Sequence, residues 1–243
     1  MITGGLNKGI TIIVTAYKAS KTIRATLDSI EYQTQFIDND DFEVLVGIDN
    51  CEDTKKYLES IRGNYRNLRL FWFTENHGTY IVKTNLAYKS KYSYLVFFDS
   101  DDIMYPTLIS EVYTNRVNGD IVRLFTNEFS TDGTPTKKDD LAGGIFGVRR
   151  ELFVKFGGFQ PWYCSADTEF IYRVHQFGYK VYRIEKKLMH RRISNISLTR
   201  RKDVGHGSSI RQAYRDERER LEKLGAGGRD LRIEIKRVDY KEL

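Results

Sequence analysis

Residues Tyr94–Asp102 read YLVFFDSDD, five apolar or aromatic residues followed by three carboxylates within four positions. Such a run, ending at a polar cluster, predicts a strand that is buried on both faces. Asp99, Asp101 and Asp102 then fall at the carboxyl end of the strand, where open α/β sheets bind their ligands. Because acids so close together repel one another, we expect a hard cation such as Mg2+ or Mn2+ to compensate them. A solvated acidic turn is the alternative, and the buried strand before it favours the metal site.

Strands and helices alternate on the N-terminal side of this stretch. Apolar runs predict strands at 10–17, 42–48 and 68–73, and helical spacing predicts helices at 20–32, 54–61 and 79–88, the first capped by Ser20. This alternation predicts an α/β fold, in which a mainly parallel, mixed central sheet carries helices on both faces.

Acids also follow the strand at 42–48, where Asp49 and Asp53 end a similar apolar run. In a parallel sheet this loop and the loop at Asp99 open on the same edge. Lys83, on the helix between them, offers a cation to phosphate oxygens. The combination predicts a nucleotide site, although each residue alone is more often structural.

Length and composition limit the class of protein. The 243 residues, 40% hydrophobic and 30% charged, suffice for one globular core with a small appendage. No apolar run approaches the roughly 20 residues of a membrane span, and no signal segment is evident. Cys51 and Cys164 lack metal-type spacing and predict no disulfide framework. We therefore expect a cytoplasmic protein, with peripheral attachment to a membrane surface left open.

The net charge of +6 is concentrated between Lys180 and Lys202, where nine basic residues face only Glu185. A basic segment of this density predicts a polyanionic partner, which would be a diphosphate, an anionic membrane surface or nucleic acid. A solvated face is the alternative.

Taken in order, these motifs resemble those of the inverting family 2 glycosyltransferases, which have the GT-A fold. The likeness runs from about Ile10 to Ile193 and rests on four stretches of the first half: Thr11–Tyr17, Ile48–Asp53, Asn76–Gly78 with Lys83, and Phe98–Asp102. They are similar to the family's opening strand, its Asp-Asp-Gly-Ser-x-Asp, its Asn-x-Gly…Ala-Arg-Asn and its Asp-x-Asp motif. Lys83 replaces the usual arginine, which keeps the charge but loses the bidentate fork.

The resemblance implies a Rossmann-like nucleotide-sugar half over about 1–105, with a UDP-sugar as the expected donor. The residues that it assigns to the donor are Thr15, Tyr17, Asp49, Lys83, Asp99 and Asp101. Mn2+ or Mg2+ would be held by Asp101 and Asp99. His190 is the expected third ligand, and His206 is its rival.

An acceptor half is implied over about 106–205, completing a GT-A domain at 1–205. Gly143–Arg150 and the Gly157-Gly158-Phe159 turn resemble the strand and loop that lead to the acceptor side. Ser165–Phe170 resembles Glu-Asp-x-Asp at a helix start, which makes Asp167 the catalytic base and Glu169 the fallback. Helix capping is the alternative role for Asp167. Trp162 and Tyr163 would stack on the acceptor, or else pack in the core.

Residues 206–243 predict a charged appendage, a helix from Ser208 followed by an alternating edge strand at 231–235. It would pack on the catalytic domain or form a homo-oligomer contact.

Three functions remain open at this point. The first is metal-dependent, inverting transfer of a sugar to a hydroxyl of a glycan or lipid-linked glycan. The second is the same chemistry on a nucleic-acid acceptor, such as a hydroxymethylated base of viral DNA. The third is a non-catalytic module that binds nucleotide sugars or polyanions, which would leave the acid cluster idle.

Overall fold

The computed structural model describes residues 7–33, 41–130, 135–193, 197–225 and 233–243. Within them, one nine-stranded sheet has the order β5-β8-β6-β7-β4-β1-β2-β3-β9. Its strands are β1 (Asn7–Ala16), β2 (Phe42–Asp49), β3 (Leu68–Phe73), β4 (Tyr92–Asp99), β5 (Ile103–Met104), β6 (Ile121–Ser130), β7 (Pro135–Arg149), β8 (Val181–Ile193) and β9 (Tyr240–Glu242). The helices are α1 (Ile23–Gln33), α2 (Glu52–Ile61), the short 3₁₀ helix η2 (Arg62–Asn64), α3 (Thr79–Lys89), α4 (Leu108–Asn115), α5 (Arg150–Lys155), α6 (Ala166–Gln176) and α7 (Ser209–Gly225).

The N-terminal half of the sheet is parallel. β1 lies between β2 and β4 and pairs in parallel with both, and β2 pairs in parallel with β3. β7 runs antiparallel to β4 and β6, whereas β8 is parallel to β6. This mixed sheet confirms the predicted α/β class, and the strands predicted at 42–48 and 68–73 match β2 and β3 closely.

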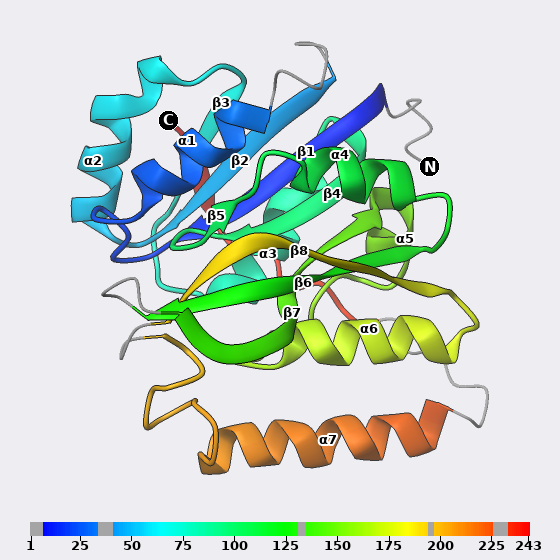
Figure 1. Cartoon of the computed structure of the whole chain (residues 1–243). Coiled ribbons are helices and arrows are strands. Elements are labelled where there is room, and N and C mark those ends of the chain that lie inside the picture. Colours follow the sequence, from blue (N-terminus) through cyan, green and yellow to red (C-terminus); the bar gives the residue numbers. More distant parts are fainter. Residues whose placement is uncertain (1–6, 34–40, 131–134, 194–196, 226–232) are drawn as a thin grey trace.

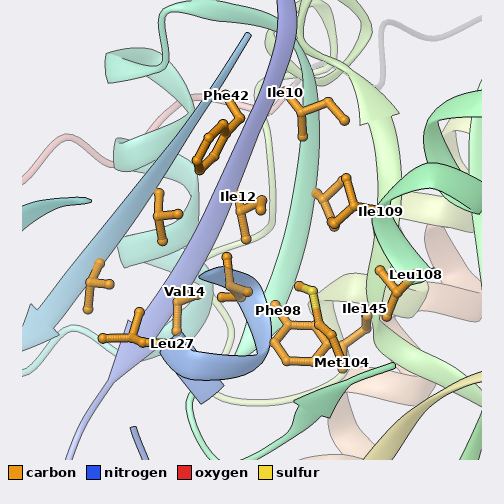
Figure 2. Packing of buried hydrophobic residues seen from close by; sticks show 14 of the residues in the cluster. Ile10, Ile12, Val14, Leu27, Phe42, Phe98, Met104, Leu108, Ile109 and Ile145 are labelled. Carbon is orange, nitrogen blue, oxygen red and sulfur yellow. The ribbon is translucent and has the colours of Figure 1, made fainter. Parts of the chain in front are cut away.

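Successive side chains of each strand point to opposite faces of the sheet, and helices cover both faces. On one face Ile12, Val14 and Phe98 pack against α1, α2 and α4, and Figure 2 shows part of this cluster around Leu27 and Met104. On the other face the strands pack against α3, α5 and α6. The strands of the parallel half are buried on both sides, as their continuous apolar sequences predicted.

One predicted cap is wrong. Ser20 does not begin α1, which starts at Ile23; its hydroxyl instead donates to Asp53 Oδ2 at 2.6 Å. A second contact, from Ala19 N to Thr54 Oγ1 at 3.0 Å, also joins the loop after β1 to the start of α2. The two loops are thereby tied together beside the carboxyl ends of their strands.

The C-terminal residues contribute two separate layers. α7 lies outside α6, farthest from the sheet (Figure 1), where the Tyr214 ring stacks on Trp162 and Arg211 donates to Ser165 Oγ. The chain then returns, so that β9 pairs antiparallel with β3 at the sheet edge. The edge strand was predicted at 231–235; its first two residues lie outside the described ones, and 233–235 are not a strand. The division at residue 205 stays a prediction, although β9 makes part of the proposed appendage integral to the sheet.

No helix in the described part of the chain is both long enough and apolar enough to cross a membrane.

Candidate active site

The strand register brings the predicted donor residues to one edge of the sheet. Thr15 of β1 is level with Asp99 of β4, and Asp49 ends the neighbouring β2. Thr15 Oγ1 lies 2.7 Å from the hydroxyl of Thr79, the first residue of α3. Tyr17, just beyond β1, is 47% exposed and therefore offers a ring to a ligand.

Asp49 fastens the loop that precedes α3. Its Oδ1 accepts from His77 N at 2.8 Å and its Oδ2 from Gly78 N at 2.9 Å. Gly78 has φ +84°, a conformation that L side chains rarely adopt, so glycine suits this turn. Burial raises the pKa of Asp49, and the two backbone amides oppose that rise. Both carboxylate oxygens of Asp49 therefore already hold the loop, in addition to any contact that Asp49 makes with the donor nucleotide.

Lys83 reaches a carboxylate rather than open solvent. Its side chain is buried, with 1% of the residue exposed, and Nζ donates to Asp99 Oδ1 at 2.7 Å. The Asp99 side chain is 43% exposed, so one end of the pair faces outward. Lys83 thus fixes Asp99 and brings a positive charge to the strand ends.

The three acids of the Asp-x-Asp stretch have different surroundings. Asp102 is buried, and its Oδ1 accepts from Arg192 N of β8 at 2.8 Å, so it joins the turn to β8 instead of facing a ligand. Burial and the charge of Asp99 raise the pKa of Asp101 to about 6, against the opposing charges of Arg192 and Arg191. Asp99 and Asp101 are therefore the pair whose repulsion a cation would relieve.

These residues fit a Mg2+ or Mn2+ ion that also binds a diphosphate. Both ions take hard oxygen ligands, and Mg2+ often uses one or two carboxylates together with substrate phosphates. Within the described ranges, no group of three His, Cys, Asp or Glu side chains is placed to hold a metal by itself. Asp99 and Asp101 would supply the carboxylates, and the remaining positions would be left to the substrate and to the predicted third ligand, His190.

The two candidate histidines differ in position. His190 lies on β8 opposite Ile103, which follows the Asp-x-Asp stretch, and its ring packs edge-on to Tyr105 at 5.1 Å. Burial lowers the pKa of His190, which favours the neutral imidazole that binds metals. His206 is exposed, in the segment before α7. The structure therefore favours His190 over its rival, and its role as a ligand stays a prediction.

Asp167 lies in the first turn of α6 and is 8% exposed. Tyr80 of α3 donates its hydroxyl to Asp167 Oδ1 at 3.0 Å. A methyl group added to Gly144 would lie 3.3 Å from Asp167 Oδ2 and 4.0 Å from Asp99 Oδ2. The predicted base and the predicted metal ligand thus approach the same point of β7, although they belong to different halves of the sequence.

Glu169 has a different environment. Its two oxygens accept from Arg173 Nε at 2.7 Å and Nη2 at 3.0 Å, and both residues are buried. Arg173 also donates to the carbonyl oxygens of Phe156 and Gly158, which fixes the turn after α5. Glu169 therefore holds the fold together here and is unsuited to the role of fallback base.

The two residues predicted to contact the acceptor differ in how accessible their rings are. The Trp162 ring stacks on Tyr214 of α7, with centroids 4.7 Å apart and planes 7° from parallel, so one of its faces is covered. Tyr163 is 64% exposed. Of the two, Tyr163 has the ring surface that an acceptor could reach.

The residues of the basic segment have different surroundings. The charges of Arg191 and Arg192 lower the pKa of Asp101, whereas Lys186 pairs with Glu111 at 2.5 Å and Arg201 pairs with Asp203. Contact of this segment with a polyanion stays a prediction.

Sequence reasoning missed Tyr80. No motif marks it, and its ring belongs to the apolar cluster on its face of the sheet. Its position on α3 three residues before Lys83, which places both on one helix face, was the available signal.

The family model for glycosyl transferase family 2 matches residues 11–208. The chain belongs to this family. The family 2 match confirms the family that the motifs predicted, and no curated protein matches the chain.

Solved structures agree with the family 2 assignment. TarS 1-349 of S. aureus in complex with UDP-GlcNAc superposes with a TM-score of 0.70 at 18% identity, covering 92% of this chain and 68% of that one. Mannosyltransferase PcManGT of Pyrobaculum calidifontis, in complex with GDP-Man and Mn2+, gives a TM-score of 0.68 at 16% identity, covering 89% and 68%. The chain spans 61% of TarS 1-349 in the complex with UDP. These matches confirm the GT-A fold, and with the family match they support the predicted glycosyltransferase class.

Proposed function

We propose that this family 2 protein is a metal-dependent, inverting glycosyltransferase that moves a sugar from a nucleotide-diphosphate sugar to an acceptor hydroxyl. UDP is the proposed nucleotide, as in the TarS complexes, while the PcManGT complex contains GDP-Man. The proposal assigns the donor to the edge formed by β1, β2 and β4, and the acceptor to the side of α6.

The observation that carries the proposal is the approach of Asp99 and Asp167 to Gly144 from opposite halves of the chain. Transfer with inversion needs a base on one side of the anomeric carbon and neutralisation of the leaving diphosphate on the other side. A non-catalytic binding module needs no buried carboxylate such as Asp167 beside Asp99. The pairing of the two acids therefore favours catalysis.

In the proposed reaction Asp167 accepts the proton of the acceptor hydroxyl while that oxygen attacks the anomeric carbon. The bond between this carbon and the diphosphate oxygen breaks on the opposite face, and the nucleoside diphosphate leaves with the bonding electrons. One displacement inverts the configuration at the anomeric carbon.

Asp99 and Asp101 would hold Mn2+ or Mg2+, which when bound neutralises charge on the diphosphate. The nearby Arg191 and Arg192 are suited to share this neutralisation with the cation. On this assignment the basic segment serves the donor diphosphate first, and a glycan or lipid-linked glycan is the proposed acceptor in preference to nucleic acid. Tyr163 is proposed to contact the acceptor ring, and Tyr17 the nucleotide.

A panel of UDP-, GDP- and other nucleotide sugars with Mn2+, scored by nucleoside diphosphate release, tests the proposal. We expect release with one nucleotide class, loss of release in EDTA and an inverted product by NMR. Full activity in EDTA would contradict the proposed metal dependence. Retained configuration at the anomeric carbon would contradict the single-displacement mechanism. Salt-sensitive binding of duplex DNA would favour the nucleic-acid acceptor instead.

A further inference from the structure

Tyr80 is a buried residue whose single polar atom points at the proposed base. Its ring packs edge-on to Phe159, with centroids 5.4 Å apart, in the cluster between the sheet and helices α3, α5 and α6. Burial and the charge of Asp167 raise the pKa of Tyr80 well above its usual value, so the phenol stays protonated. It is therefore a permanent hydrogen-bond donor in an apolar surrounding.

The two carboxylate oxygens of Asp167 have different surroundings. Oδ1 accepts from Tyr80 at 3.0 Å, and Tyr80 is the sole side-chain donor to Asp167 among the described residues. Oδ2 faces the backbone of β7, because methyl groups added to Gly143 and Gly144 would lie 3.1 and 3.3 Å from it. Because both residues are glycines, neither places a side chain of its own beside Oδ2.

A side chain of the same helix, α3, also holds Asp99 through its Oδ1 atom. Lys83, three residues after Tyr80, donates to Asp99 Oδ1, and Asp99 Oδ2 lies toward the position of the Gly144 methyl. Residues three apart on a helix share one face, so α3 holds both carboxylates from one side. Each acid keeps its Oδ2 on the Gly144 side.

We propose that Tyr80 is a positioning residue that fixes Asp167 through Oδ1, leaves Oδ2 as the proton-accepting atom, and with Lys83 sets the spacing between the two carboxylates. This inference rests on the proposed role of Asp167 as the base. Without the phenol, the carboxylate can rotate about its last bond, and Oδ2 is no longer held toward the acceptor.

Tyr80→Phe keeps the ring and removes only the donor, so it is the direct test. A reacting group that is no longer held in place can cost roughly 10–100-fold in rate. We expect kcat for transfer to fall by that factor, while the KM for the nucleotide sugar stays near wild type. Tyr80→Met, in which a flexible side chain fills the space, serves as a second variant without a donor.

The decisive readout is the double variant with Asp167→Asn. If Tyr80 acts through Asp167, Tyr80→Phe and Tyr80→Met cost activity in the wild-type background and almost nothing in the Asp167→Asn background. Equal costs in both backgrounds would show that Tyr80 only supports packing and would overturn the inference, as would wild-type kcat in both single variants. If Asp167→Asn itself keeps full activity, the base assignment in the proposed function fails instead.

Discussion

The two carboxylates that approach Gly144 are held by chemically different partners. Asp99 pairs with the buried ammonium of Lys83, whereas Asp167 accepts from the neutral phenol of Tyr80. A proposed metal ligand keeps its charge through the reaction, and a fixed cation stabilises it by a charge-assisted bond. A base gains a proton in each turnover, and beside a buried lysine that step would leave the ammonium unpaired at high cost. The neutral partner therefore suits the acid that must change its charge.

Glu169 illustrates the same rule from the other direction. It lies two residues from Asp167 on the same helix, but it shares two hydrogen bonds with buried Arg173. Protonation of Glu169 would leave that guanidinium without its counterion. The partner of each acid thus distinguishes the proposed base from its neighbour.

The largest expected effect comes from Asp101→Ala, which removes one of the two proposed metal carboxylates. Turnover should fall by roughly 10⁴-fold, since a bound cation contributes several kcal/mol. Mn2+-dependent binding of the nucleotide sugar, measured by calorimetry, should disappear with it. Asp216→Ala on the exposed α7 is the matched control and should change neither quantity. Unaltered Mn2+ dependence in Asp101→Ala would show that Asp101 does not hold the metal.

Asp167→Asn comes next. The amide keeps the shape but takes no proton, so transfer should fall by roughly 10³-fold, within the usual range for a positioned base. Donor affinity, followed by thermal shift with the nucleotide sugar, should stay near wild type.

Glu169→Gln sharpens this result, because it should act on stability. Loss of the charge opposite Arg173 should cost about 3 kcal/mol of unfolding free energy, measured in urea, while kcat at low temperature changes little. A stable but inactive Glu169→Gln protein would move the base by two residues.

Lys83→Met removes the ion pair that holds Asp99. The apolar side chain keeps much of the volume but leaves Asp99 without its ammonium, and we expect roughly a 10²-fold loss of kcat/KM for the donor. Lys83→Arg should recover part of this loss, because the charge returns in a bulkier form. Activity unchanged in Lys83→Met would mean that Asp99 needs no fixed cation.

The smallest of these effects is expected for Gly144→Ala. The new methyl would lie 3.3 Å from Asp167 Oδ2, so the carboxylate must shift by a few tenths of an ångström. We expect kcat to fall roughly 10-fold, by the logic that small misplacements of reacting groups are costly. Gly63→Ala is the matched control, since its added methyl meets nothing within 4 Å.

The sequence predicted the fold well because its signals are local. Largely apolar runs such as 68–73, which Arg69 alone interrupts, predicted strands with the right ends, since a buried parallel strand allows few polar residues. The acids at strand ends followed from topology alone, because parallel strands open on one edge. Asp167 required the family resemblance, as its position on α6 carries no spacing rule of its own.

What remained hidden depends on contacts between distant segments. Tyr80 and Asp167 are 87 residues apart, and neither residue signals the other. Asp102 looks like a third metal ligand in sequence, yet its Oδ1 accepts the backbone N–H of Arg192 on β8. The edge strand was misplaced because Tyr240–Glu242 is too short for alternation to show.

The pairing of β9 with β3 has a consequence for the folding kinetics. Arg69 of β3 donates to Glu242 of β9 across 173 residues of intervening sequence, and Arg69 also pairs with Glu43. Closing so long a loop is slow, because its entropic cost precedes any reward from contacts. Most of the parallel sheet can therefore assemble while the outer side of β3 still exposes unpaired backbone groups, which invite association with other chains. In the folded protein β9 covers this edge, so the C-terminal strand protects β3 from pairing with other chains.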